Sequence, residues 1–404
     1  MNAYLIDGIR TPIGKFGGTL APVRADDLAA HAIRSLMDRH PDIDAAHIED
    51  VLMGCANQAG EDNRNVARMA LLLAGLPYTV PGETVNRLCA SGMAAAVHAS
   101  RAIQTGDADL MIAGGMEHMT RGPWVMSKAS TAFGRDSQMH DTSFGWRFIN
   151  PKLDAVYGTE GMGSTAENLV DLHSISREDQ DRFAAWSQQK AHAAQENGHL
   201  AEEIAPVHIS RRKQDDLVFS EDEFIRAGTT AEVLSKLRPA FRREGGSVTA
   251  GNSSGLNDGA CALLLASEAG ISKWGLRPLA RFVASAVVGV EPRIMGIGPV
   301  EASKKALQRA GLTLDEMDHI ELNEAFAAQA LACTRSLGLA DDDPRINPQG
   351  GAIAIGHPLG MTGARLLLTA ARQLNRAGGK YALVTLCIGV GQGYATIIEN
   401  PNAV

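Results

Sequence analysis

The chain repeats part of its own sequence, and this repeat limits the possible folds more than any other feature. Residues 43–51 are similar to residues 312–320. Cys89 and His357 each precede a helix-like segment that leads into a strand-like one, and these correspondences share roughly the same offset along the chain. We interpret them as a duplicated unit, which would place equivalent loops of the two halves around one cleft. The alternative is that two unrelated α/β halves share this order.

Strand-length apolar runs alternate with helical segments in both halves. The predicted strands are 51–54, 110–115, 261–266, 320–322 and 382–386, and the predicted core helices are 94–104 and 364–374. Continuous apolar runs are typical of strands that are buried on both faces. The sequence therefore predicts an α/β protein with buried sheets.

The segment from 120 to 248 differs from both halves and is interpreted as an insertion. It contains Trp124, Trp146 and Trp186, together with a polar, charged helical stretch over 176–198. A loop rich in Gly, Ser and Asn follows and leads back into apolar sequence. The predicted parts are an N-terminal core half at 1–119 plus 249–272, a loop domain at 120–248, and a C-terminal core half at 273–404.

Composition and charge argue against several classes of protein. The formal net charge is −8 at pH 7, and Asp215 and Asp216 offset the short basic run at 211–213, which argues against a nucleic-acid partner. Five irregularly spaced cysteines argue against a disulfide framework and favour a reducing cytoplasm. The sequence has neither a signal-peptide pattern nor an apolar run of the ~18 residues that a membrane span needs, so no membrane partner is expected.

Three reactive side chains lie where apolar sequence gives way to small-residue turns. They are Cys89, His357 and Cys387. Such turns can present a side chain and nearby backbone N–H groups to a substrate. Two thiols and an imidazole could form an acyl thioester and move a proton beside it. A helix start at Cys89 is expected to lower the thiol pKa, and Cys387 could be an acid or base with a near-neutral pKa.

Each of these residues also has a structural interpretation. Free cysteines are often buried and simply pack, and His357 could be a hydrogen-bonded core residue rather than a base or an oxyanion donor. Asn323, which follows a predicted strand, could hold a water, donate to an oxyanion or cap a helix. A zinc site made of His357 and the two cysteines lacks the usual ligand pairs, and the glycines at 389–393 lack the spacing of a dinucleotide loop.

Four motifs identify a family resemblance. They are Asn86–Gly92, Asn323–Ala327, Gly350–Pro358 and Cys387–Gly391. With these motifs in order, the chain resembles the thiolases along nearly its full length. The resemblance implies a duplicated α/β/α/β/α layered core with an inserted loop domain, which binds coenzyme A and makes the oligomer contacts of a homodimer or homotetramer.

The resemblance implies ping-pong chemistry on a 3-oxoacyl-CoA. Cys89, deprotonated with help from His357, would attack the 3-keto carbon and keep the acyl group as a thioester. Cys387 would protonate the enolate of the departing acetyl-CoA. His357 and a water held by Asn323 would form one oxyanion hole, and the backbone N–H groups of Cys89 and Gly389 would form a second. Coenzyme A would then take the acyl group from Cys89.

The resemblance also predicts the coenzyme A contacts. Ser254 would bond the pantetheine, Arg226 would lie near the nucleotide, and Ala325 and Phe326 would line the pantetheine tunnel. Taken alone, Arg226 could equally be a solvated loop charge. Coenzyme A would be a substrate, and no metal or other permanently bound cofactor is required.

Other segments narrow the expected substrate. Thiolases of the acetoacetyl-CoA biosynthetic type often carry His-Met-Gly where this chain has Gly161, Met162 and Gly163. Segments 60–70 and 144–151 are similar to those of thiolases that cleave 3-oxoadipyl-CoA to succinyl-CoA and acetyl-CoA. The alternatives are a broad 3-ketoacyl-CoA thiolase, an acetyl-CoA acetyltransferase that acts on acetoacetyl-CoA, and a protein that binds acyl-CoA without turnover.

A dicarboxylic acyl chain would need a cation near its free carboxylate. Arg121, Lys128 and Arg147 in the insertion are the candidates. Each of them could instead be a solvated surface charge.

Overall fold

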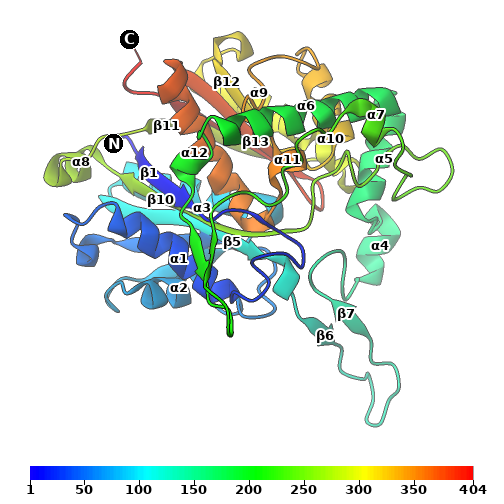
Figure 1. The fold of residues 1–404 in the computed structure, drawn as a ribbon, viewed down its shortest axis with the longest axis horizontal. Helices are drawn as coiled ribbons and strands as arrows, with labels where there is room; N and C mark the ends of the chain where they lie inside the picture. Colours follow the sequence, from blue (N-terminus) through cyan, green and yellow to red (C-terminus); the bar gives the residue numbers. More distant parts are fainter. Residues whose placement is uncertain (404) are drawn as a thin grey trace.

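The structure is a computed structural model that describes residues 1–403 and shows helices around and between the strands of a large sheet (Figure 1). Val404, the last residue of the predicted C-terminal half, lies outside the described residues. The main-sheet strands are β1 Tyr4–Arg10, β2 Gly14–Lys15, β3 Asp50–Gly54, β4 Gly82–Val85, β5 Leu110–His118, β10 Asn257–Ala266, β11 Ala280–Gly289, β12 His319–Leu322, β13 Tyr381–Ile388 and β14 Gln392–Glu399. The helices packed around this sheet are α1 Ala25–Asp38, α2 Val66–Ala74, α3 Ser91–Thr105, α8 Glu268–Trp274, α9 Gly298–Ala310, α10 Ala327–Ser336, α11 Ala352–Ile355 and α12 Leu359–Ala377.

The main sheet is continuous through both halves of the molecule. Its strand order is β12-β13-β14-β11-β1-β10-β5-β3-β4, with β2 paired to β10. The antiparallel pairs Tyr4↔Arg281 and Leu5↔Ala280 join β1 to β11 and so connect the two halves. Within the halves, β3 runs parallel to β4 and β5, and β12 runs parallel to β13.

The two halves repeat the same arrangement. In order towards the centre of the sheet, β3, β5, β10 and β1 correspond to β12, β13, β14 and β11, and β4 is an additional strand outside β3. Helix α1 leads to β3 as α9 leads to β12, and a 3-10 turn lies in each repeated segment, at Ala45–His47 and Leu314–Glu316. In the same way α3 leads to β5 and α12 leads to β13. The duplication predicted from the sequence is therefore present in the fold.

Helices α3 and α12 pack against each other between the two halves of the sheet. Their contact is close, because a methyl group on Gly92 of α3 would lie 2.6 Å from the carbonyl oxygen of Gly360 on α12. Helices α1 and α2 cover the outer face of the first half, and α9 covers that of the second. Along β10, Leu263 packs toward the central helices and Leu264 toward α1. Burial on both faces explains the continuous apolar runs of these strands.

The chain between β5 and β10 contributes no strand to the main sheet. It forms the two-stranded sheets β6 Trp124–Met126 with β7 Met139–Asp141 and β8 Val207–Ile209 with β9 Leu217–Phe219, and the helices α4 Pro151–Tyr157, α5 Met162–His173, α6 Arg177–Glu196 and α7 Ala231–Leu234. The β6–β7 hairpin projects away from the body of the molecule (Figure 1). Buried Arg10 of β1 ties this segment to the core, because its guanidinium pairs with Glu203 (2.7 Å) and Asp222 (2.6 Å).

The predicted strands coincide with β3, β5, β10, β12 and β13, and the predicted helices with α3, α6 and α12. Each is longer than or close to its predicted span because sequence patterns define element ends poorly. Within residues 1–403, none of the helices combines the length and apolar character needed to cross a membrane.

Candidate active site

Cys89 lies in a 3-10 turn, Leu88–Ala90, immediately before α3. Leu88 has a φ of 48°, a left-handed conformation that residues with side chains rarely adopt. Asn86 stabilises this turn because its Oδ1 accepts the N–H of Leu88 (2.9 Å). The turn packs against α12 and β13, and the thiol is partly buried. The N–H groups of Gly389 and of Cys89 itself are directed at the sulfur.

His357 is held by bonds that determine which ring nitrogen carries the proton. It follows Gly356, whose φ of 111° favours glycine, and its own N–H donates to Asn257 Oδ1 (2.9 Å). His357 Nδ1 lies 2.7 Å from Thr362 Oγ1, and the Thr362 hydroxyl donates to the carbonyl oxygen of Pro358 (2.9 Å). That hydroxyl can therefore only accept from Nδ1. The neutral imidazole carries its proton on Nδ1 and has a lone pair on Nε2.

The side-chain amide of Asn323 faces the lone pair on His357 Nε2. Asn323 is fully buried after β12, and its backbone N–H donates to the carbonyl oxygen of Thr385 on β13 (3.0 Å). Its Nδ2 lies 3.4 Å from His357 Nε2, and its Oδ1 has no hydrogen-bond partner among residues 1–403. The alternative role as a helix cap is wrong, because α10 begins four residues later, with Phe326 at the cap position and no side-chain cap.

Cys387 lies near the end of β13, buried and paired in register with Gly393 of β14. A charge on Cys89 would act on this thiol, so the two sulfur atoms are near each other. Gly389 follows the same strand, and a methyl group there would lie 3.4 Å from Leu88 Cδ1. The structure thus brings the five predicted catalytic residues together from four loops.

The electrostatics of the site differ from the expectation. Burial raises the pKa of Cys89 to about 11, although the N–H groups of Gly389 and of Cys89 lower it. Burial also raises the pKa of Cys387 well above its ordinary value, and burial together with Arg365 lowers the pKa of His357 to about 3. The expected lowered pKa of Cys89 and near-neutral pKa of Cys387 are therefore wrong, because desolvation outweighs the hydrogen-bond donors. Before substrate binds, both thiols are protonated and the imidazole is neutral.

Three of the four predicted coenzyme A residues lie side by side. The N–H of Ser254 donates to the carbonyl oxygen of Ala325 (3.0 Å), and Ser253 forms a β-bridge with Phe326. Ala325 and Phe326 are buried in the same apolar cluster as Cys387. The loop at 249–259 is thus joined to the segment that carries Asn323.

The fourth residue, Arg226, is exposed and lies next to the same loop. Its guanidinium stacks on the Phe224 ring at 5.3 Å, and a methyl group on Gly255 would lie 2.6 Å from that ring. Within residues 1–403 the Arg226 side chain forms no ion pair, so its charge is open to a ligand.

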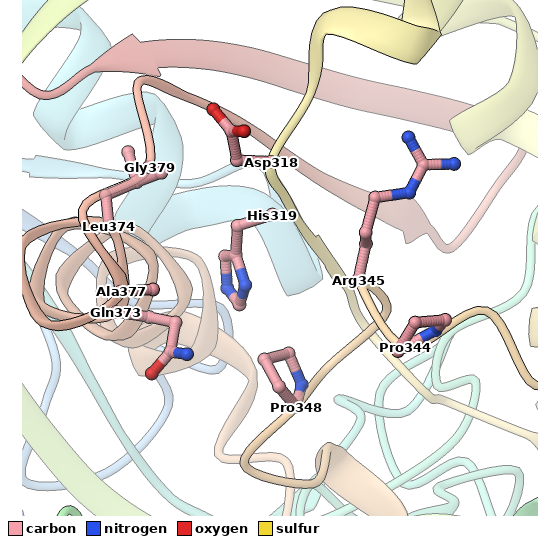
Figure 2. A pocket seen from close by; sticks show the side chains of 9 residues that line it. All are labelled: Asp318, His319, Pro344, Arg345, Pro348, Gln373, Leu374, Ala377 and Gly379. Carbon is pink, nitrogen blue, oxygen red and sulfur yellow. The ribbon is translucent and has the colours of Figure 1, made fainter. Parts of the chain in front are cut away.

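A separate hollow lies at the other end of β12 (Figure 2). Its lining includes Asp318, His319, Arg345 and Gln373. Because His319 begins the strand and Asn323 follows its end, this hollow does not include the predicted catalytic residues.

Sequence patterns missed the residues that hold the catalytic loops. Thr362 and Asn257 orient His357, as described above. The buried carboxylate of Glu117 accepts the N–H groups of Ala56 (3.0 Å) after β3 and Gly360 (2.8 Å) at the start of α12, and burial raises its pKa to about 7. The one available signal was the position of Thr362 in the first turn of the helix after His357.

Comparison with known proteins identifies two matching family models and several similar proteins. Residues 3–269 match the model described as "Thiolase, N-terminal domain", and residues 276–400 match "Thiolase, C-terminal domain". The chain is 59% identical to the beta-ketoadipyl-CoA thiolase of Acinetobacter baylyi, over 98% of this chain and 99% of that protein. It is 58% identical to the 3-oxoadipyl-CoA/3-oxo-5,6-dehydrosuberyl-CoA thiolase of Escherichia coli, over 98% of this chain and 99% of that protein. Among solved structures, the acetyl-CoA acetyltransferase of Bacillus anthracis matches with a TM-score of 0.91 and 40% identity, covering 99% of this chain and 98% of that one.

Proposed function

This chain belongs to the thiolase family, and we propose that its main substrate is 3-oxoadipyl-CoA, which it cleaves with coenzyme A to succinyl-CoA and acetyl-CoA. As a thiolase it is an acyltransferase. The proposal rests on the convergence of Cys89, His357 and Cys387. The choice of substrate is supported by the relatives named beta-ketoadipyl-CoA thiolases.

In the first half-reaction, Cys89 would lose its proton to His357 Nε2 and attack the 3-keto carbon. The lone pair on Nε2, which the Asn323 amide approaches at 3.4 Å, supports this role for the imidazole. The N–H groups of Cys89 and Gly389 would stabilise the resulting oxyanion, because both are directed at the thiol. Since the thiol pKa is about 11, proton removal would be coupled to attack rather than precede it.

Cleavage of the Cα–Cβ bond would leave the electron pair on the acetyl-CoA fragment as an enolate. Asn323 Nδ2, a water and the newly protonated Nε2 of His357 would stabilise the enolate oxygen. Cys387 would donate its proton to the α-carbon, since burial keeps this thiol protonated until a strong base arrives. Acetyl-CoA would leave, and Cys89 would retain a succinyl thioester.

In the second half-reaction, the coenzyme A thiol would give its proton to the Cys387 thiolate and attack the succinyl thioester. Succinyl-CoA would leave, and the displaced Cys89 thiolate would take back the proton held on His357 Nε2, which restores the free enzyme. Ser254, Ala325 and Phe326 would hold the pantetheine, and the open charge of Arg226 would bind a phosphate of the nucleotide. We propose that coenzyme A is only a substrate and that no cofactor stays bound.

The test is a CoA-dependent cleavage assay with purified protein on 3-oxoadipyl-CoA and acetoacetyl-CoA, with Cys89→Ala as the matched control. A strong preference for 3-oxoadipyl-CoA, together with a succinyl group on Cys89 by mass spectrometry, would support the proposal. Comparable or reversed rates would indicate a broad 3-ketoacyl-CoA thiolase or an acetyl-CoA acetyltransferase. If the protein and Cys89→Ala were equally inactive on both, a non-catalytic acyl-CoA-binding protein would be the better description.

We also propose a homodimer or homotetramer in which 120–248 is the loop domain between core halves at 1–119 plus 249–272 and 273–404. Two features support association. Strand β4 is an outer strand of the main sheet, and the projecting β6–β7 hairpin exposes Trp124, Met126 and Phe133. All five cysteines are free thiols, which fits the proposed cytoplasmic setting.

A further inference from the structure

The geometry points to Arg147 as the residue that binds the free carboxylate of the acyl chain. This inference rests on the proposed function, because only a dicarboxylic substrate carries such a group. It goes further in naming one side chain as the determinant of acyl specificity.

Among residues 1–403, no carboxylate neutralises the charge of Arg147. Arg147 is partly buried, and its Nη2 donates to Asn57 Oδ1 at 3.0 Å. Within residues 1–403 it forms no ion pair. The nearby carboxylate of Glu117 is already bonded to the backbone N–H groups of Ala56, Asn57 and Gly360. A neutral amide orients the cation, and its remaining N–H donors are left for a ligand.

The loop that orients Arg147 is bonded directly to the turn that carries the nucleophile. Asn86 Nδ2 donates to the carbonyl oxygen of Ala56 (3.0 Å), the residue before Asn57. The Oδ1 of the same Asn86 accepts the N–H of Leu88 (2.9 Å), the residue before Cys89. Two hydrogen bonds from the Asn86 side chain therefore connect the loop that holds Arg147 to the turn that carries Cys89.

The segment around Arg147 is also anchored on the opposite side of the site. Trp146 Nε1 donates to the carbonyl oxygen of Glu160 (3.3 Å). Two residues further on, Met162 packs against the apolar cluster that contains Cys387. The Trp146–Arg147 pair thus bridges from the Cys387 side of the site to the loop beside Cys89.

The other two candidate cations are unsuitable. Arg121 makes two bonds to the Glu61 carboxylate (2.7 and 2.5 Å) and a third to the carbonyl oxygen of Ala21 (3.0 Å). Lys128 is exposed in the segment that connects β6 to β7. Of the three cations predicted from the sequence, only Arg147 combines partial burial, a neutral partner and a connection to the thiol turn.

The test compares two substrates of equal chain length. 3-Oxoadipyl-CoA ends in a carboxylate, and 3-oxohexanoyl-CoA has a methyl group at the same carbon. Arg147→Gln should lower kcat/KM for 3-oxoadipyl-CoA by roughly 10- to 100-fold, the range expected for a lost hydrogen bond to a charged group. It should change kcat/KM for 3-oxohexanoyl-CoA by less than about two-fold, because that substrate does not use the cation. Lys128→Gln is the matched control. It should leave the ratio of kcat/KM for 3-oxoadipyl-CoA to kcat/KM for 3-oxohexanoyl-CoA unchanged.

The outcomes separate this inference from the proposed function. If the wild-type protein shows no preference for 3-oxoadipyl-CoA, the proposed function fails. If the wild-type protein shows the preference, the inference alone is overturned by either of two results. Arg147→Gln would lower kcat/KM equally for both substrates, or it would lower kcat/KM for neither. Should Arg147→Gln fail to fold, Arg147→Lys carries the test. That variant keeps the positive charge but loses the planar guanidinium, which can bind a carboxylate through two N–H groups. The preference for 3-oxoadipyl-CoA over 3-oxohexanoyl-CoA should therefore fall by about three- to ten-fold, and an unchanged preference would overturn the inference.

Discussion

The hydroxyl of Thr362 should control the rate of acyl transfer through its hydrogen bond to His357. It accepts from His357 Nδ1 (2.7 Å) and donates to the carbonyl oxygen of Pro358 (2.9 Å). Thr362→Val has nearly the same shape but can neither accept nor donate. Thr362→Ser keeps the hydroxyl and is the matched control. We therefore expect the valine variant to lose activity and the serine variant to retain most of it.

The size of the effect follows from the charge on the ring. In the free enzyme the imidazole is neutral, and its bond to Thr362 contributes about 1 kcal/mol. After His357 takes the proton of Cys89, the same bond becomes charge-assisted and contributes about 1.5–3 kcal/mol. The difference, about 0.5–2 kcal/mol, is lost only in the transition state. It corresponds to a decrease in kcat of roughly 2- to 30-fold.

A second effect falls on stability. The valine variant leaves the buried Nδ1–H of His357 without a partner, which should lower the free energy of unfolding by about 1–3 kcal/mol. Steady-state kinetics over pH 6–9 and urea denaturation of both variants measure the two effects separately. If Thr362→Val kept wild-type kcat at every pH while Thr362→Ser behaved identically, the assigned tautomer of His357 would be wrong.

Three further predictions concern the site and the core. Asn323→Ala should lower kcat by about 10²–10³-fold, the decrease typical when one oxyanion donor is lost. Steady-state rates measure this effect, and a decrease below about ten-fold would exclude Asn323 as an oxyanion donor. Because the pKa of Cys89 is about 11, its alkylation by iodoacetamide, followed by mass spectrometry, should still accelerate as the pH rises past 9, whereas a plateau near neutral pH would indicate a preformed thiolate. Arg10→Met leaves Glu203 and Asp222 buried without their cation, and urea denaturation should show a loss of about 3–5 kcal/mol; a loss under about 1 kcal/mol would mean that the pair contributes little.

Local sequence was sufficient to predict the main strands and helices and to identify the candidate reactive residues. Strands β3, β5 and β13 are buried on both faces, so continuous apolar runs marked them clearly. Cys89, His357 and Cys387 lie at strand or helix ends, where a short motif must contain both the reactive side chain and the glycines of the turn. The repeated segments at 43–51 and 312–320 indicated the duplication, because each half folds into the same local units.

The interactions between distant segments could not be predicted in this way. Arg121, Lys128 and Arg147 have the same charge in sequence, but only the fold pairs Arg121 with Glu61 and leaves Arg147 with Asn57. Asn323 was compatible with a helix cap until the structure directed its amide to His357.

The sequence by itself determined which residues could react and which half of the chain each belongs to. Tertiary structure decided their ionisation, the tautomer of His357 and which of the candidate cations is already paired with a carboxylate. The reason is physical: a motif specifies neighbours along the chain, whereas desolvation and hydrogen-bond partners come from residues far away in sequence. The Cys89 thiol shows this most clearly, since its motif predicts a lowered pKa and the packing of α12 and β13 around it raises that pKa to about 11.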